Sequence, residues 1–312
     1  HSQLKRPVLL VTDRSDRSLS LFGELGLWLP DALRLFFPEP NPLFYENAAW
    51  GESTRRDRMM ALTVLTSYHL PGAETPRRAP VIVASARAVM TRTLPRRDFL
   101  KASKVLRRGQ EISIGNLVRE CYSLGYEYAN TVIAPGQYAR RGGLLDLWPP
   151  AEPAPVRLEF FGNEIDTLRR FDPATQRSTK PESGQQSDRT WLTPAREFLI
   201  SKELKSSDAD PSRLDEGGSR QFTEFDIPYL HPTPASLLDY LPRQAIVLID
   251  DLQALEEGIA DIEEQAVKLR KEFVKEGSVS ADFPLPYLTI EEVRDSLHRR
   301  QTIELGSSYA TA

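Results

Sequence analysis

The sequence predicts an α/β protein whose open parallel sheet is interrupted by an inserted α+β unit of antiparallel strands. The parallel sheet is predicted by short apolar runs near both ends of the chain and by the helical patterns that alternate with them. The insertion is predicted because several strand-like segments follow one another closely in the middle of the chain. We therefore expect one α/β domain in two parts, 1–106 and 183–312, with a separate domain at 107–182.

The first part of the chain alternates strands with helices. Residues 7–13 form a continuous apolar run closed by a polar turn, which is typical of a buried parallel strand, and 80–90 read as another strand followed by the start of a helix. Residues 32–40 read as a further strand that prolines end. A helix is predicted over 53–70, with Ser53 or Thr54 as its cap. Met59, Leu62 and Leu65 share one face of that helix, which predicts a buried face.

The middle of the chain predicts a meander. A short helix around 114–124 precedes several strands, and Gly162-Asn163 joins strand 155–161 to the strand that follows. A two-residue connection of this kind suits a tight hairpin turn. The polar residues 175–190 predict a loop or linker.

The last part returns to the parallel pattern. Residues 244–253 form an apolar strand that ends in Asp250 and Asp251, and a long helix follows it. That helix carries an apolar stripe of about three heptads, which indicates a core-facing helix more than a coiled coil. The stripe consists of Leu252, Leu255, Ile259, Ile262, Ala266, Leu269 and Phe273. Gly277 is expected to end the helix, and the polar tract 206–221 is expected to be flexible.

Composition excludes several classes of protein. The 312 residues exceed what one core of typical size needs, and 40 basic against 44 acidic residues give a net charge of −4. This balance lacks the basic footprint of a dedicated nucleic-acid binder. No run of 18 apolar residues occurs and residues 1–7 lack a signal-peptide core, so we expect a soluble, cytoplasmic protein without membrane contact.

No motif for a cofactor, a metal or covalent catalysis is present. The single cysteine, Cys121, excludes an internal disulfide framework and is expected to be a small buried side chain. The four histidines show no ligand-like spacing. We expect no cofactor and no metal.

The strand that ends in Asp250 and Asp251 has the form of a Walker B strand. Its partner would be GxxxxGK[ST], whose amides and lysine hold the phosphates, and the chain contains no such motif. We therefore expect this chain not to be an enzyme. The two aspartates are read as a relic of an NTPase fold or as a cap for the next helix.

The strongest candidate for a binding site lies on strand 155–161. Alternation places Val156, Leu158 and Phe160 on a core face and Arg157, Glu159 and Phe161 on the other. An exposed aromatic beside an arginine has the composition of a protein-interaction hot spot, although Phe161 could instead pack under a neighbouring helix or loop.

A second arginine pair precedes this strand. Arg140 and Arg141 come before Gly142-Gly143, where the chain can bend or bulge. One of them could converge with Arg157, or both could be solvated surface residues. The acidic surroundings favour a protein interface over a nucleic-acid groove. They are Asp146, Glu152, Glu159, Glu164 and Asp166.

The segments GQYARRGGLLDLWPP and PVRLEFFGNEIDTLRRFDPATQRS resemble the second domain of the UvrB-homology module (domains 1a, 2 and 1b) at the N-terminus of bacterial transcription-repair coupling factors. FPEPNPLFYEN, STRRDRMM and VIVASARAVMTRTLPRRDF resemble its first domain, and PTPASLLDYLPRQAIVLIDDLQ is similar to the UvrB segment that carries the Walker B acids. The resemblance implies a degenerate P-loop helicase-like (RecA-like) sheet without ATPase activity.

The resemblance also implies a partner. In this family the inserted domain binds the excision-repair protein UvrA, a distant domain masks that surface at rest, and other domains bind RNA polymerase and translocate on DNA. The family's contact residues correspond to Arg141, Arg157 and Phe161. Truncating Arg157 or Phe161 is then expected to abolish UvrA binding with little change in melting temperature.

Two alternatives stay open, and two departures from the family are noted. A nucleic-acid-binding relic of a helicase domain would use Arg140, Arg141, Arg169 and Arg170 on phosphates, and a working NTPase would be stabilised by nucleotide. Compared with the family, the chain begins after the expected first strand and degenerate P-loop helix, and residues 206–225 are shorter than expected.

Overall fold

The computed structural model describes residues 6–42, 50–70, 75–179, 188–199, 222–277 and 279–306. The chain divides into two compact units, one made of residues 1–96 and 208–312 and the other of residues 97–207. The polar tract 206–221, which we expected to be flexible, lies outside the described residues.

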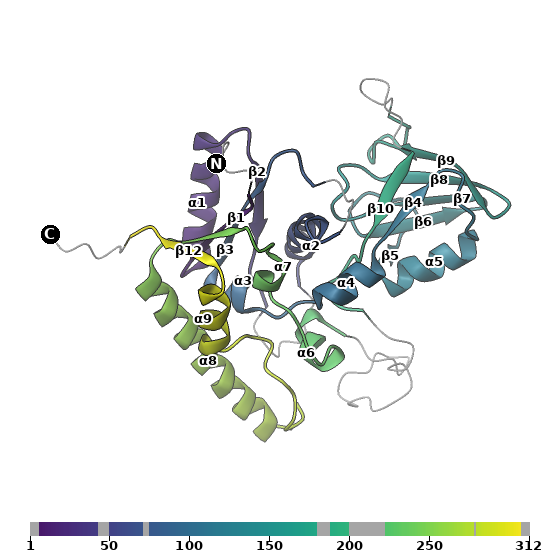
Figure 1. The fold of residues 1–312 in the computed structure, drawn as a ribbon. Coiled ribbons are helices and arrows are strands. Elements are labelled where there is room, and N and C mark those ends of the chain that lie inside the picture. Colours follow the sequence, from purple (N-terminus) through teal and green to yellow (C-terminus); the bar gives the residue numbers. More distant parts are fainter. Residues whose placement is uncertain are drawn as a thin grey trace. The chain divides into compact units, whose positions relative to one another are not determined.

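The first unit is built on a five-stranded parallel sheet in the order β12-β11-β1-β3-β2 (Figure 1). Its strands are β1 (Val8–Thr12), β2 (Leu33–Phe37), β3 (Pro80–Ser85), β11 (Ile246–Ile249) and β12 (Gln301–Glu304). The central strands β1 and β3 are buried along their whole length, as their continuous apolar runs predict. The edge strand β12 is exposed at every residue.

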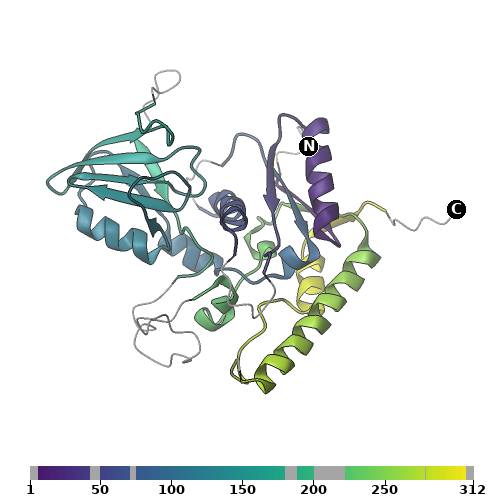
Figure 2. The same ribbon diagram turned by 180° about the vertical axis from the view of Figure 1, so that it is seen from behind.

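Two helices cover opposite faces of this sheet. The chain passes from β1 through α1 (Ser15–Trp28) to the edge strand β2, then returns through α2 (Glu52–Ser67) to β3. Right-handed crossovers that run in opposite directions place their helices on opposite faces. Figures 1 and 2 show α1 and α2 on either side of the strands.

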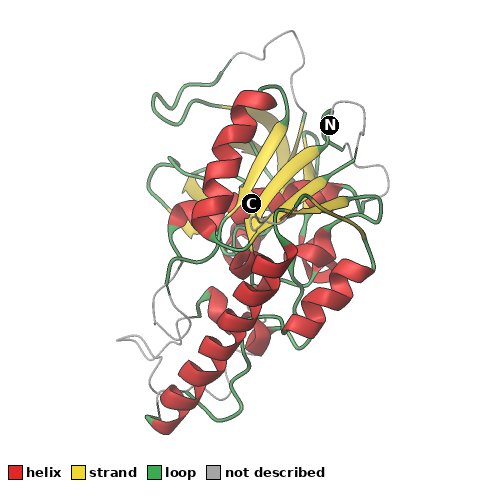
Figure 3. Cartoon of the chain, turned by 90° about the vertical axis from the view of Figure 1, so that its left-hand side faces the viewer, coloured by secondary structure: helices red, strands yellow, loops and turns green. Residues whose placement is uncertain are grey.

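The long helix predicted after Asp251 is α8 (Leu252–Lys275), and the first unit contains further short helices besides it. They are α3 (Ala86–Met90), α6 (Ile227–Leu230), α7 (Leu237–Tyr240) and α9 (Ile290–His298), with a 3-10 turn at Glu224–Asp226. The stripe of α8 faces the core, since Leu255, Ile259 and Ala266 are buried, and Gly277 follows the helix with a φ of 75°. Figure 3 shows α8 as the longest helix.

The predicted cap of α2 is wrong. The helix begins at Glu52 with Gly51 as its cap residue, and no side chain caps it. The hydroxyl of Thr54 instead donates to Asn41 Oδ1 over 3.4 Å. The predicted buried face is confirmed, because Met59, Leu62 and Leu65 are all fully buried.

The second unit is an antiparallel sheet with one helix packed on it. The sheet has the order β5-β6-β7-β8-β9, in which only β5 pairs with its neighbour in parallel. Its strands are β5 (Glu127–Tyr128), β6 (Gln137–Arg141), β7 (Leu144–Leu147), β8 (Val156–Phe161) and β9 (Glu164–Arg170). The helix α5 (Ile114–Ser123) presents Leu117 and Cys121 to the core of this unit.

A separate pair of strands closes the second unit. The strands β4 (Lys104–Arg107) and β10 (Arg189–Leu192) pair in antiparallel register, with Arg107 opposite Arg189. The unit therefore extends at both ends beyond 107–182, and the last residues of the polar stretch 175–190 belong to β10 instead of a linker. The helix α4 (Arg96–Ala102) leads into β4.

Candidate protein-binding site

The sheet of the second unit has one buried face and one polar face. On β8 the side chains of Val156 and Leu158 are fully buried in the core and Phe160 packs against it, as alternation predicts. Cross-strand register extends the opposite face over four strands, because directly opposed residues point the same way. This polar face is formed by Arg141 of β6, Leu144 and Asp146 of β7, Arg157, Glu159 and Phe161 of β8, and Thr167 and Arg169 of β9. Ala139 of β6 points the same way but is buried in a small apolar cluster with Val132 and Phe171.

Arg141 ends β6 at a tight turn. It pairs with Leu144, so Gly142-Gly143 form a two-residue hairpin loop, and Gly142 has a φ of 58° that suits glycine. The exposed Arg141 donates from Nη2 to the carbonyl oxygen of Asn130 over 2.9 Å and to Thr131 Oγ1 over 3.3 Å. Its other guanidinium nitrogens make no hydrogen bond to the described residues.

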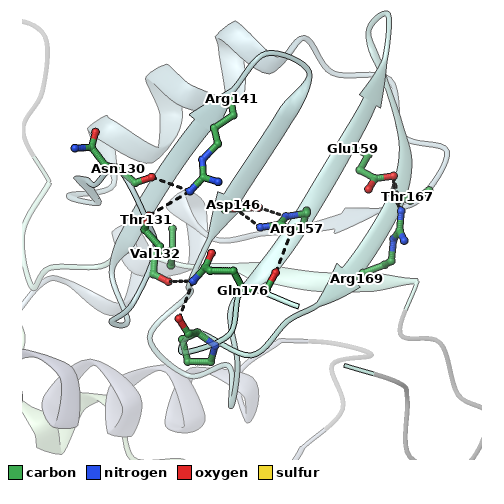
Figure 4. Close-up of polar contacts among 11 residues, drawn as sticks. Asn130, Thr131, Val132, Arg141, Asp146, Arg157, Glu159, Thr167, Arg169 and Gln176 are labelled. Atoms are coloured by element: carbon green, nitrogen blue, oxygen red, sulfur yellow. Dashed lines mark hydrogen bonds and ion pairs between the residues drawn. The ribbon is translucent and has the colours of Figure 1, made fainter. Parts of the chain in front are cut away.

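Arg157 is held within its own sheet. Nε and Nη2 donate to the two oxygens of Asp146 over 2.7 and 2.8 Å, which makes a bidentate ion pair (Figure 4). The side chain of Arg157 is 18% exposed and that of Asp146 is 4% exposed. The same guanidinium lies 4.7 Å from the ring centroid of Phe171, and the hydrogen bond to Asp146 raises the pKa of Arg157.

Gln176 connects Arg157 to two loops beside the polar face. Its backbone has a φ of 59°, a left-handed conformation that is uncommon for a residue with a side chain. Its carbonyl oxygen accepts from Arg157 Nη1 over 3.4 Å, and its Nε2 donates to the carbonyl oxygens of Val132 and Pro173 over 3.2 and 2.7 Å. Figure 4 shows Gln176 between Arg157 and the loop that carries Val132.

Phe161 lies at the far end of β8 and is 83% exposed. It pairs with Glu164 across the turn Gly162-Asn163, in which Gly162 has a φ of 62°. This is the predicted two-residue hairpin. The prediction that Phe161 is exposed is confirmed, and the alternative that it packs under a helix or loop is wrong.

Arg169 and Glu159 form a second ion pair on the polar face. Glu159 Oε2 accepts from the Thr167 hydroxyl over 2.7 Å and from Arg169 Nη2 over 2.6 Å. These two hydrogen bonds lower the pKa of Glu159, and the bond from Thr167 has the larger effect. Outside this face, Arg170 Nη2 donates to Glu152 Oε2 over 2.5 Å.

Arg141, Arg157 and Phe161 thus share a face without touching one another. Arg141 and Arg157 stand on strands that β7 separates, which sets their backbones about 10 Å apart across the sheet. Phe161 lies four residues along β8 from Arg157, a distance of about 13 Å. The three residues mark out a broad surface of the size that a protein partner covers, instead of a pocket for a small molecule.

Sequence reasoning missed Asp146, Phe171 and Gln176 as parts of this arrangement. Asp146 was grouped only with the acidic surroundings. An acid inside the apolar segment LLDLW signals a buried partner, but the register that places it opposite Arg157 is not visible in a single strand.

The strand end at Asp250 and Asp251 does not form an open acidic site. Asp250 accepts from Arg17 Nε and Nη2 over 2.7 and 3.1 Å. Asp251 is buried and its Oδ1 accepts from the backbone N–H of Ala254 over 3.0 Å, so it caps α8. The interpretation as a helix cap is confirmed for Asp251.

Three further observations concern chemistry and membranes. Burial raises the pKa of the Cys121 thiol to about 12, which fits the predicted small buried side chain. Among the described residues no group of three or more His, Cys, Asp or Glu side chains is arranged to hold a metal ion. Nor do these residues include a helix with the length and apolar character that a membrane crossing requires.

Known proteins resemble the chain in two ways. Residues 105–198, which run from β4 past β10, match the model of the UvrB interaction domain. The transcription-repair-coupling factor of Bacillus subtilis is 27% identical over 92% of this chain and 26% of its own length. That of Myxococcus xanthus is 32% identical over 66% of this chain and 16% of its own length. The UvrABC system protein B of Gloeothece citriformis is 27% identical over 56% of this chain and 31% of its own length.

The chain therefore spans about a quarter or less of the coupling factors just described. The similarity to them covers most of the chain, and the match to the UvrB interaction domain covers the unit that carries the polar face. Together these likenesses identify the chain as a UvrB-like module of the kind found in transcription-repair-coupling factors.

Proposed function

We propose that this chain is a non-catalytic recruitment module that binds UvrA through the polar face of unit 97–207. The observation that carries the proposal is Phe161, which is 83% exposed on the polar face within the stretch that matches the UvrB interaction domain. Aromatic and arginine side chains dominate the binding energy of protein interfaces, and Phe161 shares its face with Arg141 and Arg157.

The charge pattern of the unit supports a protein partner over a nucleic acid. Phosphate binding needs cations that are free to neutralise the backbone. Arg157 and Arg169 are each paired with a carboxylate on the polar face, and Arg170 is paired with Glu152. Of the four arginines assigned to the nucleic-acid alternative, only Arg140 and Arg141 have no carboxylate partner among the described residues.

In this proposal Phe161 and Arg141 contact UvrA, and Arg157 contributes from behind the surface. Phe161 supplies the apolar anchor. Arg141 supplies charge-assisted hydrogen bonds to carboxylates or carbonyls of UvrA. The guanidinium N–H groups of Arg157 that we expected to reach UvrA already donate to Asp146. The main effect of Arg157 in this proposal is therefore to hold the shape of the polar face.

We further propose that the parallel sheet derives from a P-loop helicase-like (RecA-like) domain and does not hydrolyse ATP. Support comes from Asp250 and Asp251, which are engaged by Arg17 and by the start of α8. In a longer chain, regions outside this sequence would bind RNA polymerase and DNA, and this module would couple stalled transcription to excision repair.

Binding to purified UvrA, measured by co-elution on size exclusion and by calorimetry, tests the proposal. Phe161→Ala is expected to weaken binding by roughly 2–4 kcal/mol while the fold is kept. Tyr128→Ala is the matched control, since Tyr128 is 63% exposed in the same unit but pairs with Tyr138 on the opposite face. Equal affinity of wild type and Phe161→Ala would rule out this face.

The nucleic-acid alternative has its own test. Fluorescence anisotropy with labelled duplex and single-stranded DNA at two salt concentrations would reveal phosphate contacts as affinity that falls steeply with salt. We expect no binding at either concentration. Salt-sensitive binding that Arg140→Ala and Arg141→Ala remove would favour that alternative.

A further inference from the structure

A groove lies at one end of the parallel sheet in the first unit, far along the sequence from the polar face. It has a volume of about 580 Å³, within the usual range of ligand-binding clefts. It is formed where α1 ends, where α2 ends and where the chain enters β3. Its lining includes Trp28, Asp31, Tyr68, Arg77 and Arg78.

Trp28 is the principal apolar feature of this groove. It is the last residue of α1 and is 79% exposed, whereas Trp50 of the same unit is 1% exposed in the core. Tyr68 lines the same groove and is partly buried, which raises the pKa of its hydroxyl. Tryptophan, tyrosine and arginine are the residue types most enriched at the energetic centres of protein interfaces.

The rim of the groove is positively charged on balance. Arg78 and Asp31 form an ion pair with 3.2 Å between Nη1 and Oδ1. Arg77 is exposed and makes no hydrogen bond or ion pair to the described residues. Within the part of the chain that the structure describes, Arg77 is therefore a cation without a partner, beside apolar lining residues. These are Leu29, Pro30, Ala32, Pro76 and Ala79.

We propose that this groove is a second docking site, which binds a protein segment carrying an aliphatic or aromatic side chain next to an aspartate or glutamate. The apolar side chain packs between Trp28 and Tyr68, and the carboxylate pairs with Arg77. The apolar lining and the one cation that has no partner among the described lining residues favour such a peptide over a nucleic-acid strand, which presents a phosphate at every step. The site is independent of the proposed UvrA-binding face, because it lies in the other unit.

A random peptide library displayed on phage is the probe for the first experiment. Selection on the wild-type chain is expected to enrich peptides with an acidic residue beside an apolar one. The affinity of a synthetic, fluorescein-labelled selected peptide should fall about tenfold or more in Trp28→Ala and in Arg77→Glu. Leu19→Ala is the matched control, because Leu19 is 60% exposed on α1 but does not line the groove.

Several results would overturn this proposal. They are failure to enrich any peptide whose binding depends on Trp28, enrichment of peptides without acidic residues, and an equal loss of peptide affinity in Leu19→Ala.

Two competing occupants are tested with the same variants. Trp28-dependent binding of a labelled single-stranded oligonucleotide would assign the groove to a nucleic acid instead, and Trp28-dependent dimerisation in sedimentation would assign it to a second copy of the chain. Phe161→Ala should leave peptide binding unchanged, which separates this proposal from that for UvrA.

Discussion

The guanidinium of Arg157 belongs to the proposed binding surface but is already engaged within its own unit. Its bonds to Asp146 and Gln176 and its position over Phe171 use most of its bonding capacity inside the unit. Asp146 is almost fully buried, and Arg157 is its counter-ion. Arg157 therefore stabilises the face on which Phe161 and Arg141 stand.

This pairing changes the expected effect of Arg157→Ala on stability. The sequence alone led us to expect an unchanged melting temperature, but removal of the arginine leaves the Asp146 carboxylate buried without its counter-ion. We expect a loss of about 2–3 kcal/mol in the free energy of unfolding, measured by urea denaturation. Phe161→Ala should change this free energy by less than about 0.5 kcal/mol, because its side chain is exposed.

The double variant Asp146→Ala with Arg157→Ala provides the control. If the ion pair is the cause, removing both partners costs less than removing Arg157 alone, since no unpaired charge remains. Additive losses would contradict this account of Arg157.

At the scale of residues, the sequence predicted on which face of a strand a side chain lies better than it predicted which side chain it contacts. Alternation on one strand correctly separated Phe160 from Phe161, because that separation depends only on a period of two. The ion pair between Arg157 and Asp146 depends on the register between two strands, which a turn outside both segments sets.

At the scale of elements, tight turns fix the polar face. Two hairpins, at Gly142-Gly143 and Gly162-Asn163, set the register of β6 against β7 and of β8 against β9. Both begin with a glycine of positive φ. The second hairpin was predictable because its two residues stand between two clear strands. The cap of α2 was not predictable. Ser53 and Thr54 are both residue types that suit a helix cap, but the helix begins before them, at Glu52.

Substitution of Gly162 tests the role of this turn. A Cβ at Gly162 would meet no atom within 4 Å, so the cost of Gly162→Ala comes from the backbone conformation alone. We expect a loss of about 1 kcal/mol in stability. Gly115→Ala, at an equally open position in α5 of the same unit, should instead stabilise by a few tenths of a kcal/mol. If thermal unfolding showed that both variants lose stability, or that both gain it, the argument from φ would be contradicted.

At the scale of the whole molecule, each unit has its own hydrophobic core. The main core of the second unit is made entirely from residues within 97–207, including Leu106, Cys121, Leu158 and Leu192. The alternation of strands with helices predicted the other unit's parallel sheet. The ends of the second unit were harder to place, because β4 and β10 are far apart in sequence and neither is distinctive alone.

Residues 97–207 should therefore fold when produced alone. We expect a single cooperative unfolding transition, measured by circular dichroism, and dispersed amide signals in NMR. Leu158→Ala should lower the stability of this fragment by about 2–5 kcal/mol, because its side chain is fully buried in the core. A fragment without a cooperative transition would show that the unit needs the rest of the chain.

The pairing of β4 with β10 has a practical consequence. It places Lys104 opposite Leu192, so the segment between these two residues begins and ends at neighbouring positions. An inserted segment with adjacent ends disturbs its host little. Grafting residues 104–192 into a surface hairpin of an unrelated protein is therefore expected to transfer the proposed UvrA-binding face together with the sheet that carries it.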